Sequence, residues 1–298
     1  MTKRDTTNEN ETGITTNENE TGITTPPTIH LILQGKGGCG KTVVASWLAE
    51  FLMGRGQPVC CVDGDPVNRS LAQFKALPVE ILDLVNQDGV VIRSNYDRLI
   101  DRFLTDKSVF AVDSAATAFL PFWTFILESD VITVLRAAGR RVYIHIPISG
   151  GEMLNDSLLG FRTLAEKAAE KSLVVWINEY FGPVESNGKT LDQMQVYLDN
   201  REKVVASIGL PQLSPDTFAA NVRKMREKKL TFQEAVRMAP GFLAAGKAAP
   251  VYGAQGPVRT TGRDTVCIEV HHIEPHYTRP IPHRHRRVAG LEATRQWR

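Results

Sequence analysis

The residues best suited to chemistry stand together in one glycine-rich stretch, QGKGGCGKT over residues 34–42. Its spacing fits the pattern G-x-x-x-x-G-K-[ST], which binds the phosphates of a nucleotide triphosphate. Glycines let backbone N–H groups surround phosphate oxygens, and the start of a following helix adds positive potential. In this pattern Lys41 contacts the β- and γ-phosphates, and Thr42 offers its hydroxyl to Mg²⁺. The residues expected to hold the nucleotide are Gly35, Gly37, Gly38, Cys39, Gly40, Lys41 and Thr42.

The same stretch contains a competing pattern, the dinucleotide fingerprint G-x-G-x-x-G over residues 35–40. Asp63 follows at about the distance at which that fingerprint places an acidic residue. A dinucleotide loop has no need of a lysine and a hydroxyl at the positions of Lys41 and Thr42. These two residues therefore favour a triphosphate over a dinucleotide.

Acidic residues follow two other apolar runs of the chain. Asp113 follows the run 109–112, and Asp63 and Asp65 follow the run 59–62. Active sites of open parallel sheets lie at the carboxyl ends of strands, so we expect these side chains near the phosphate loop. We predict that Asp113 binds Mg²⁺ with Thr42 and that Asp65 positions or polarises an attacking water. The alternative for each aspartate is a turn or a helix cap.

Strand and helix patterns alternate from residue 28 onward, which predicts an α/β fold with a mainly parallel sheet and helices on both faces, as in P-loop NTPases. His30 and His145 lie inside predicted strands and are expected in the core. Thr231 and Glu234 form a capping-box pattern, and Ser214 with Pro215 is typical of a helix start. The predicted strands cover residues 29–33, 59–62, 79–82, 109–112, 142–148, 173–177 and 204–208. The predicted helices cover residues 43–49, 70–75, 97–104, 119–127, 130–138, 150–171 and 191–200, with two more beginning at 214 and 231.

Both ends of the chain lack such patterns. Residues 1–27 contain the polar unit TTNENETGI twice, at 6–14 and 15–23, and we expect a disordered leader. Residues 28–245 form the predicted ATPase domain, and residues 246–298 are predicted to be a disordered basic tail. Histidines in this tail are an alternative metal-binding set. They are His271, His272, His276, His283 and His285.

Composition limits the class of protein. The 298 residues are 42% hydrophobic and 23% charged, with a net charge of +2, which gives no global argument for nucleic-acid binding. The sequence contains neither an apolar run of about 18 residues nor a signal-peptide core, which favours a cytoplasmic protein without a membrane span. The four cysteines show no metal or redox spacing, and Cys60 and Cys61 should face opposite sides of a strand. Cys39, inside the phosphate loop, is expected to have a lowered thiol pKa.

A basic segment precedes the predicted last helix. A dimer could present two such segments to the phosphates of DNA, whereas the simpler interpretation is a solvated helix face. Its basic residues are Arg223, Lys224, Arg226, Lys228 and Lys229.

The run KGGCGKT over residues 36–42 resembles the deviant Walker A loop of the ParA/MinD ATPases, K-G-G-x-x-K-[ST]. The resemblance implies an ATP-dependent homodimer in which Lys36 reaches the nucleotide of the partner copy. It also implies that Asn178, after the run 173–177, reads the adenine edge. The guanine-reading pattern N-K-x-D is absent here, because Asn178 is followed by EYF, and this favours ATP over GTP.

Later motifs, DGDPVN at 63–68, WINEYFGP at 176–183 and LTFQEA at 230–235, resemble those of the TraL family, ParA/MinD-type proteins of conjugative plasmids. This resemblance covers about residues 28–238 and implies an ATP-binding accessory factor that acts with conjugation or relaxosome proteins. The leader repeat and the segment after about residue 240, which could be a frameshifted end, depart from that family.

Two other function classes fit the same scaffold. A plasmid partition ATPase would share the loop and the aspartates. An ATP-dependent biosynthetic ligase would need a substrate pocket, for which Ser149, Gly150 and Gly151 are the candidates. An iron–sulfur reductase is excluded because no cysteine lies between Cys61 and Cys267.

Overall fold

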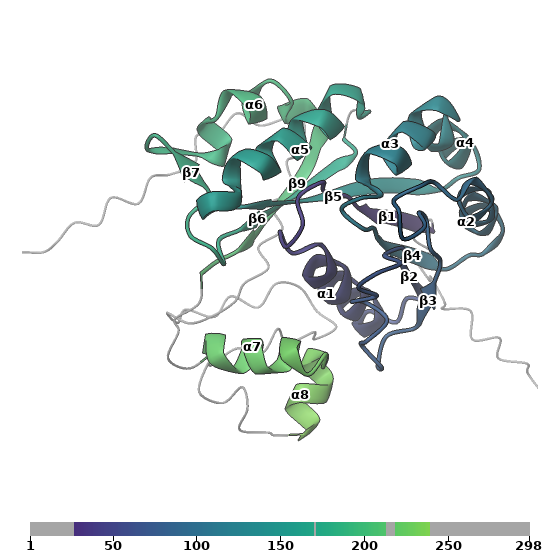
Figure 1. Cartoon of the computed structure of the whole chain (residues 1–298), viewed down its shortest axis with the longest axis horizontal. Coiled ribbons are helices and arrows are strands. Elements are labelled where there is room, and N and C mark those ends of the chain that lie inside the picture. Colours follow the sequence, from purple (N-terminus) through teal and green to yellow (C-terminus); the bar gives the residue numbers. More distant parts are fainter. Residues whose placement is uncertain (1–26, 170, 213–217, 239–298) are drawn as a thin grey trace, which may run out of the picture.

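A sheet of seven parallel strands forms the centre of the computed structural model, which describes residues 27–169, 171–212 and 218–238 (Figure 1). The strand order is β3-β2-β4-β1-β5-β6-β9, so β1 lies in the middle. All seven predicted strands are present, and the predicted fold class is confirmed. The strands are β1 Thr28–Ile32, β2 Val59–Asp63, β3 Val79–Ile81, β4 Val109–Asp113, β5 Arg141–Ser149, β6 Leu173–Asn178 and β9 Val204–Leu210. A separate antiparallel hairpin joins β7 Glu185–Ser186 to β8 Lys189–Thr190.

Helices cover both faces of this sheet. In Figure 1, α3 and α5 lie on one side, and α1, α7 and α8 lie on the other. The long helices are α1 Lys41–Gly54, α2 Arg93–Thr105, α3 Phe119–Glu128, α4 Val131–Ala137, α5 Leu154–Lys167, α7 Phe218–Glu227 and α8 Phe232–Met238. The short ones are η1 Gly151–Met153, η2 Leu191–Gln193, α6 Gln195–Leu198 and η3 Arg201–Lys203.

Side chains alternate between two apolar clusters because successive residues of a strand point to opposite faces. In β4, Phe110 and Val112 belong to the cluster that includes residues of α2 to α5, whereas Ala111 belongs to the cluster that includes residues of α1. Cys60 and Cys61 divide in the same way, as predicted. The core is therefore two layers with the sheet between them.

Two predicted helices are wrong. Residues 70–75 form turns, because the Asp63 carboxylate accepts the N–H groups of Leu71 and Ala72, each at 2.9 Å, and Arg69 has a left-handed φ of 44°. The helix predicted at 191–200 divides into η2 and α6, because Thr190 closes the first turn as a capping box and Met194 is extended. The predicted helix at 150–171 is shorter, since η1 replaces its first turn and Ala168 is extended.

Other expectations lie outside the described residues. These are the leader repeat, the Ser214–Pro215 helix start, the basic tail and its histidines. Within the described ranges, no helix is long and apolar enough to cross a membrane.

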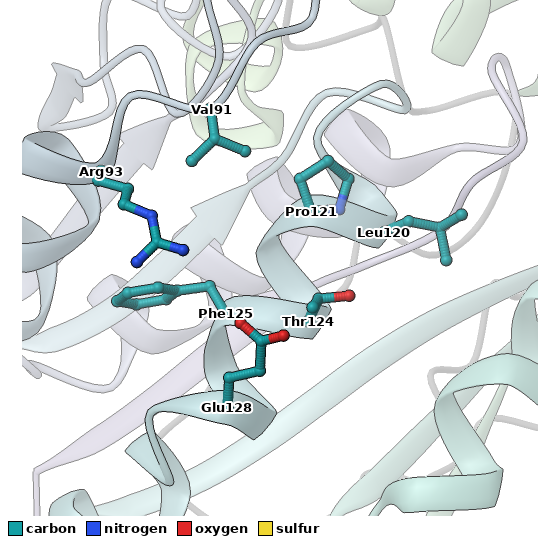
Figure 2. A pocket seen from close by; sticks show the side chains of 7 residues that line it. All are labelled: Val91, Arg93, Leu120, Pro121, Thr124, Phe125 and Glu128. Atoms are coloured by element: carbon teal, nitrogen blue, oxygen red, sulfur yellow. The ribbon is translucent and has the colours of Figure 1, made fainter.

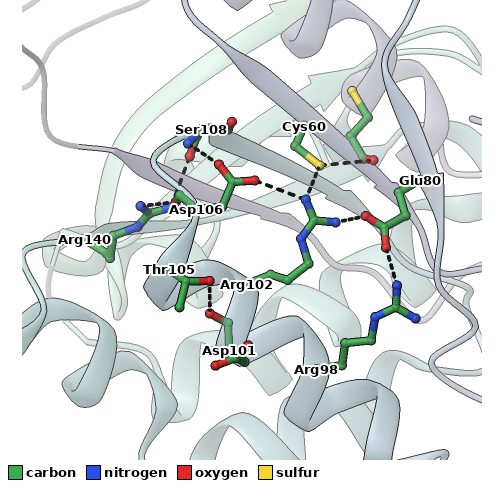
Figure 3. Close-up of polar contacts among 10 residues, drawn as sticks. Cys60, Glu80, Arg98, Asp101, Arg102, Thr105, Asp106, Ser108 and Arg140 are labelled. Atoms are coloured by element: carbon green, nitrogen blue, oxygen red, sulfur yellow. Dashed lines mark hydrogen bonds and ion pairs between the residues drawn. The ribbon is translucent and has the colours of Figure 1, made fainter.

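An ionic cluster holds α2 to one edge of the sheet (Figure 3). The Arg102 guanidinium forms ion pairs with Glu80 on β3 and with Asp106, the latter at 3.1 Å. The Arg140 guanidinium donates to the backbone oxygens of Asp106 and Ser108 at 2.7 and 3.1 Å. Both guanidinium groups also lie over the Phe110 ring, so they stabilise the edge by packing as well as by charge.

A chain of buried hydrogen bonds crosses the middle of the sheet. The indole N–H of Trp176 donates to His145 Nδ1 at 2.9 Å, and His145 Nε2 lies 2.8 Å from His30 Nδ1. Because an indole is only a donor, His145 must be the neutral Nε2–H tautomer, which then donates to His30. Burial lowers the pKa of His30 to about 4 and holds the pKa of His145 well below its ordinary value. Both histidines are core residues, as predicted.

The α7–α8 pair docks on α1 through a buried carboxylate. Glu50 accepts the backbone N–H groups of Phe232 and Gln233 at 3.0 and 2.9 Å, which caps the start of α8. The Trp47 and Phe232 rings lie 5.4 Å apart beside this contact. The capping box of Thr231 and Glu234 is present as predicted, since each residue accepts the other's backbone N–H.

Candidate nucleotide-binding site

The glycine stretch forms the loop between β1 and α1, at the carboxyl end of the central strand. Gly38 and Gly40 have φ values of 76° and 106°, a backbone region that favours glycine. The helix α1 begins at Lys41, and its N-cap residue, Gly40, forms no side-chain cap. The N–H groups of the first turn and the positive end of the helix dipole are therefore available to an anion.

Two lysines lie at this loop. The Lys41 ammonium donates to the backbone oxygen of Lys36 at 3.1 Å, so its side chain bends back over the loop. The Lys36 ammonium pairs with Asp156 in the first turn of α5 at 2.5 Å, and both side chains are substantially exposed to solvent. The predicted loop lysines thus lie together, with Lys36 on the outer side.

Thr42 and Asp113 meet at the base of the loop. The Thr42 hydroxyl donates to Asp113 Oδ2 at 2.6 Å, and Asp113 is only 3% exposed. The second oxygen, Oδ1, is buried and has no hydrogen-bond partner among the described residues. Burial, with the nearby carboxylates of Asp63 and Asp65, raises the pKa of Asp113 to about 7, although the Thr42 hydroxyl and the Lys41 charge oppose this rise.

A buried oxygen without a partner carries a free-energy cost that a cation can remove. Hydroxyl and carboxylate oxygens are the ligands that Mg²⁺ prefers, and Mg²⁺ is usually held by one or two carboxylates together with substrate phosphates and water. Thr42 and Asp113 therefore fit the predicted Mg²⁺ site. Among the described residues, no group of three or more His, Cys, Asp or Glu side chains forms an all-protein metal site.

The two aspartates after β2 differ in their surroundings. Asp63 is fully buried and accepts three backbone N–H groups. It therefore has the turn-forming role that the sequence offered as the alternative to a role in catalysis. Asp65 accepts the N–H groups of Val67 and Asn68 at 2.9 Å each, and it also accepts the Asn68 amide. Burial alone would raise the pKa of Asp65, but these hydrogen bonds and the Lys41 charge hold it below its ordinary value. Asp65 is therefore a partly accessible carboxylate with a favoured negative charge.

Sequence reasoning missed one buried residue that supports the loop. Gln34 is fully buried; its amide donates to the backbone oxygens of Pro147 and Ser157 at 3.0 Å each, and its carbonyl accepts the Gly35 N–H at 2.9 Å. Gly160 on α5 makes room for this side chain, because a Cβ there would lie 1.7 Å from Gln34 Oε1. The sequence feature that could have identified Gln34 is its position, since it is a polar residue between a buried strand and the glycine loop.

The ligase alternative placed a substrate pocket at Ser149, Gly150 and Gly151, and these residues are tightly packed. A Cβ at Gly150 would lie 2.1 Å from the backbone oxygen of Gly182, and one at Gly151 would lie 2.5 Å from that of Phe181. Ser149 is fully buried and donates to the backbone oxygen of Cys39 at 2.9 Å. This segment therefore packs against the loop after β6 and supports the phosphate loop.

The expectation for the Cys39 thiol is wrong. Cys39 is fully buried, and this burial raises the thiol pKa although the Lys41 charge and N–H act to lower it. Its side chain therefore packs inside the protein, and only its backbone remains a candidate for phosphate contact.

The basic segment on α7 is smaller than predicted. The Arg226 guanidinium lies over the Tyr180 ring at 5.7 Å, and the Lys229 ammonium lies 5.8 Å from the centre of the Phe74 ring. These two residues face the rest of the protein. Arg223, Lys224 and Lys228 remain exposed.

A pocket of about 360 Å³ lies between α3 and the start of α2 (Figure 2). None of its lining residues belongs to the phosphate loop or to the strand-end aspartates. It is lined by Val91, Arg93, Leu120, Pro121, Thr124, Phe125 and Glu128.

Two curated relatives decide the family. Protein TraL from Escherichia coli is 36% identical over 209 residues, which covers 70% of this chain and 86% of that protein. A second Protein TraL from Escherichia coli is 35% identical over 209 residues, with the same coverage. The chain belongs to the TraL family. No protein-family model matches this TraL-family chain.

Two solved structures resemble the chain at low identity. The first is a putative plasmid partition protein from Borrelia burgdorferi B31 bound to AMPPNP, with 12% identity, 72% of this chain and 99% of that chain covered, and a TM-score of 0.35. The second is the septum site-determining protein MinD from Pyrococcus horikoshii OT3 complexed with Mg-ADP, with 15% identity, 77% and 99% covered, and a TM-score of 0.41.

Proposed function

We propose that this TraL-family chain binds ATP with Mg²⁺ on the loop between β1 and α1 and hydrolyses it slowly. The observation that carries the proposal is the unpartnered buried oxygen of Asp113 beside the Thr42 hydroxyl. Lys41 and the free N–H groups of α1 would hold the phosphates, and Thr42 with Asp113 would hold the metal. Bound Mg²⁺ would neutralise charge on the phosphate oxygens.

The expected preference for ATP over GTP rests on the loop after β6. Asn178 is followed by Glu179, Tyr180 and Phe181, so the guanine-reading aspartate of N-K-x-D has no counterpart here. Competition between ATP and GTP for the purified protein tests this choice. Tighter GTP binding would contradict it.

A nucleotide-dependent homodimer is the second part of the proposal. It is supported by the resemblance of the loop and by the exposed pair of Lys36 with Asp156, since exposed ion pairs contribute little and exchange readily. Light scattering should show that Mg-ATP doubles the mass of the wild type and leaves Lys36→Ala a monomer. Lys189→Ala, an exposed lysine on β8, is the control and should dimerise. An unchanged wild-type mass with Mg-ATP would contradict the dimer.

We also propose that the protein acts in the cytoplasm as an accessory factor in plasmid conjugative transfer, with conjugation or relaxosome proteins as partners. Membership of the TraL family supports this role. Removing the gene from its plasmid should lower the transfer frequency, and wild type but not Lys41→Ala should restore it. A change in plasmid retention without a change in transfer would favour the partition alternative.

DNA is a second candidate partner, favoured by three exposed basic side chains, Arg223 and Lys224 on α7 and Lys228 just after it. We expect binding that needs ATP, weakens with salt and is lost when Arg223, Lys224 and Lys228 are changed to Glu. The control carries an equal charge change on other exposed positions, Lys107→Glu with Arg136→Glu and Lys189→Glu. Equal loss in both variants, or binding that ignores ATP, would remove α7 as the DNA surface.

A further inference from the structure

The backbone oxygen of Cys39 accepts two side-chain hydrogen bonds. The Ser149 hydroxyl donates to it at 2.9 Å, and the Asn178 amide donates to it at 3.0 Å. All three residues are buried, so neither bond is exchanged for water. A carbonyl in the middle of the phosphate loop is thus fixed from two directions.

The two donors come from neighbouring strands of the sheet. Ser149 ends β5 and Asn178 ends β6, and the two residues are partners in the parallel register. The Tyr180 N–H donates to Asn178 Oδ1 at 3.2 Å, which turns the NH₂ end of the amide toward the loop. The amide therefore has partners at both ends inside the protein, which differs from the adenine-reading role that the resemblance implies.

The direction of this carbonyl matters for an anion. Cys39 lies between Gly38 and Gly40, whose positive φ values reverse the local peptide planes. A loop that presents N–H groups to phosphate must turn its carbonyl oxygens away, because a carbonyl dipole pointing inward repels the negative charge. Gly40 also permits the close approach, since a Cβ there would lie 3.0 Å from Asn178 Nδ2.

We infer that Ser149 and Asn178 are positioning residues that hold the Cys39 carbonyl away from the phosphate site. Asn178 accordingly acts on the triphosphate through the loop and does not select the base. The inference rests on the proposed nucleotide site and assigns it two supporting side chains.

The first test measures affinity for Mg-ATP and for Mg-GTP in wild type, Ser149→Ala and Asn178→Ala. Each variant should bind both nucleotides roughly fivefold more weakly, because one buried hydrogen bond to the loop is lost. The ratio of ATP affinity to GTP affinity should stay at the wild-type value. Ser172→Ala is the matched control. Its buried hydroxyl donates to the backbone oxygen of Ala169 just before β6, at the end of this strand opposite to Asn178. Loss of this hydroxyl should leave the nucleotide affinity unchanged.

The second test needs no nucleotide. Buried Cys39 should react slowly with a maleimide in the wild type and in Ser172→Ala, and clearly faster in Ser149→Ala and Asn178→Ala, because the loop is less well held. Mass spectrometry of the labelled peptides separates Cys39 from the other cysteines. Ser149→Ala removes a single oxygen atom, so the folded state should persist, and a melting curve checks this.

Three results would overturn the inference. The first is that Asn178→Ala weakens the binding of ATP but not of GTP, while Ser149→Ala binds both nucleotides like the wild type. The second is wild-type affinity in both variants. The third is a rate of Cys39 labelling that neither variant changes. A wild type that binds no nucleotide is a different failure. It would contradict the proposed function, while the labelling experiment would still show whether Ser149 and Asn178 hold the loop.

Discussion

At the scale of single residues, Asp65 combines a turn-forming carboxylate with a charge close to Lys41. We predict that Asp65→Asn binds ATP but hydrolyses it about 100-fold more slowly, since the charge that would polarise water is gone. Asparagine keeps an oxygen for the N–H groups of Val67 and Asn68, so the melting temperature should change little. Phosphate release measures the rate, and turnover equal to wild type would remove Asp65 from the mechanism.

Some site residues could be predicted and others could not, for a physical reason. Lys41, Thr42 and Asp113 are placed by rules that hold for any strand–loop–helix unit in a parallel sheet. The partners of Cys39 lie 110 and 139 residues away, and local sequence carries no sign of that contact. The same burial explains why the thiol pKa was predicted in the wrong direction.

At the scale of elements, the contact of α8 with α1 depends on one buried carboxylate. Glu50→Ala should lower the free energy of unfolding by about 2 kcal/mol, because the N–H groups of Phe232 and Gln233 lose their acceptors inside the protein. Urea unfolding measures this loss, and faster amide exchange in α8 should accompany it. Glu227→Ala on the exposed face of α7 is the control. Equal stability of the two variants would show that Glu50 does not hold the helix pair.

Elements were predicted well where periodicity alone decides them. All seven strands were found, because most of them are largely apolar runs between turns, as expected for buried parallel strands. The edge strand β3, which contains Glu80 and has no fully buried residue, is the exception. The segments 70–75 and 191–200 were mispredicted, because side chains outside the expected helices, Asp63 and Thr190, bind backbone N–H groups there. Such competition between side chain and backbone is not visible in a hydrophobic pattern.

At the scale of the whole molecule, the buried histidine pair links stability to pH. The pKa of His30 is about 4 in the folded protein and near 6.5 when unfolded, so the unfolded chain binds more protons between these values. The stability that the neutral histidines contribute is therefore fully present above about pH 6.5 and is lost as the pH falls toward 4. We expect a loss of about 1 kcal/mol from His30 between pH 7 and 5.5, and the lowered pKa of His145 acts in the same direction.

Urea unfolding across this pH range measures the effect. His30→Leu with His145→Leu should be less stable at pH 7, since the Trp176 N–H loses its acceptor, but its stability should depend much less on pH. A variant with the wild-type slope would assign the pH dependence to other groups.

The central claim, that Mg-ATP binds between Lys41, Thr42 and Asp113, is tested most directly by thermal stabilisation. The wild type should be stabilised by ATP with Mg²⁺, by about 2.7 kcal/mol when ATP is present at 100 times its dissociation constant, and much less when EDTA removes the metal. Lys41→Ala should show no stabilisation, and Asp113→Asn should show the same small effect with and without Mg²⁺. Stabilisation of both variants equal to that of the wild type would contradict the account.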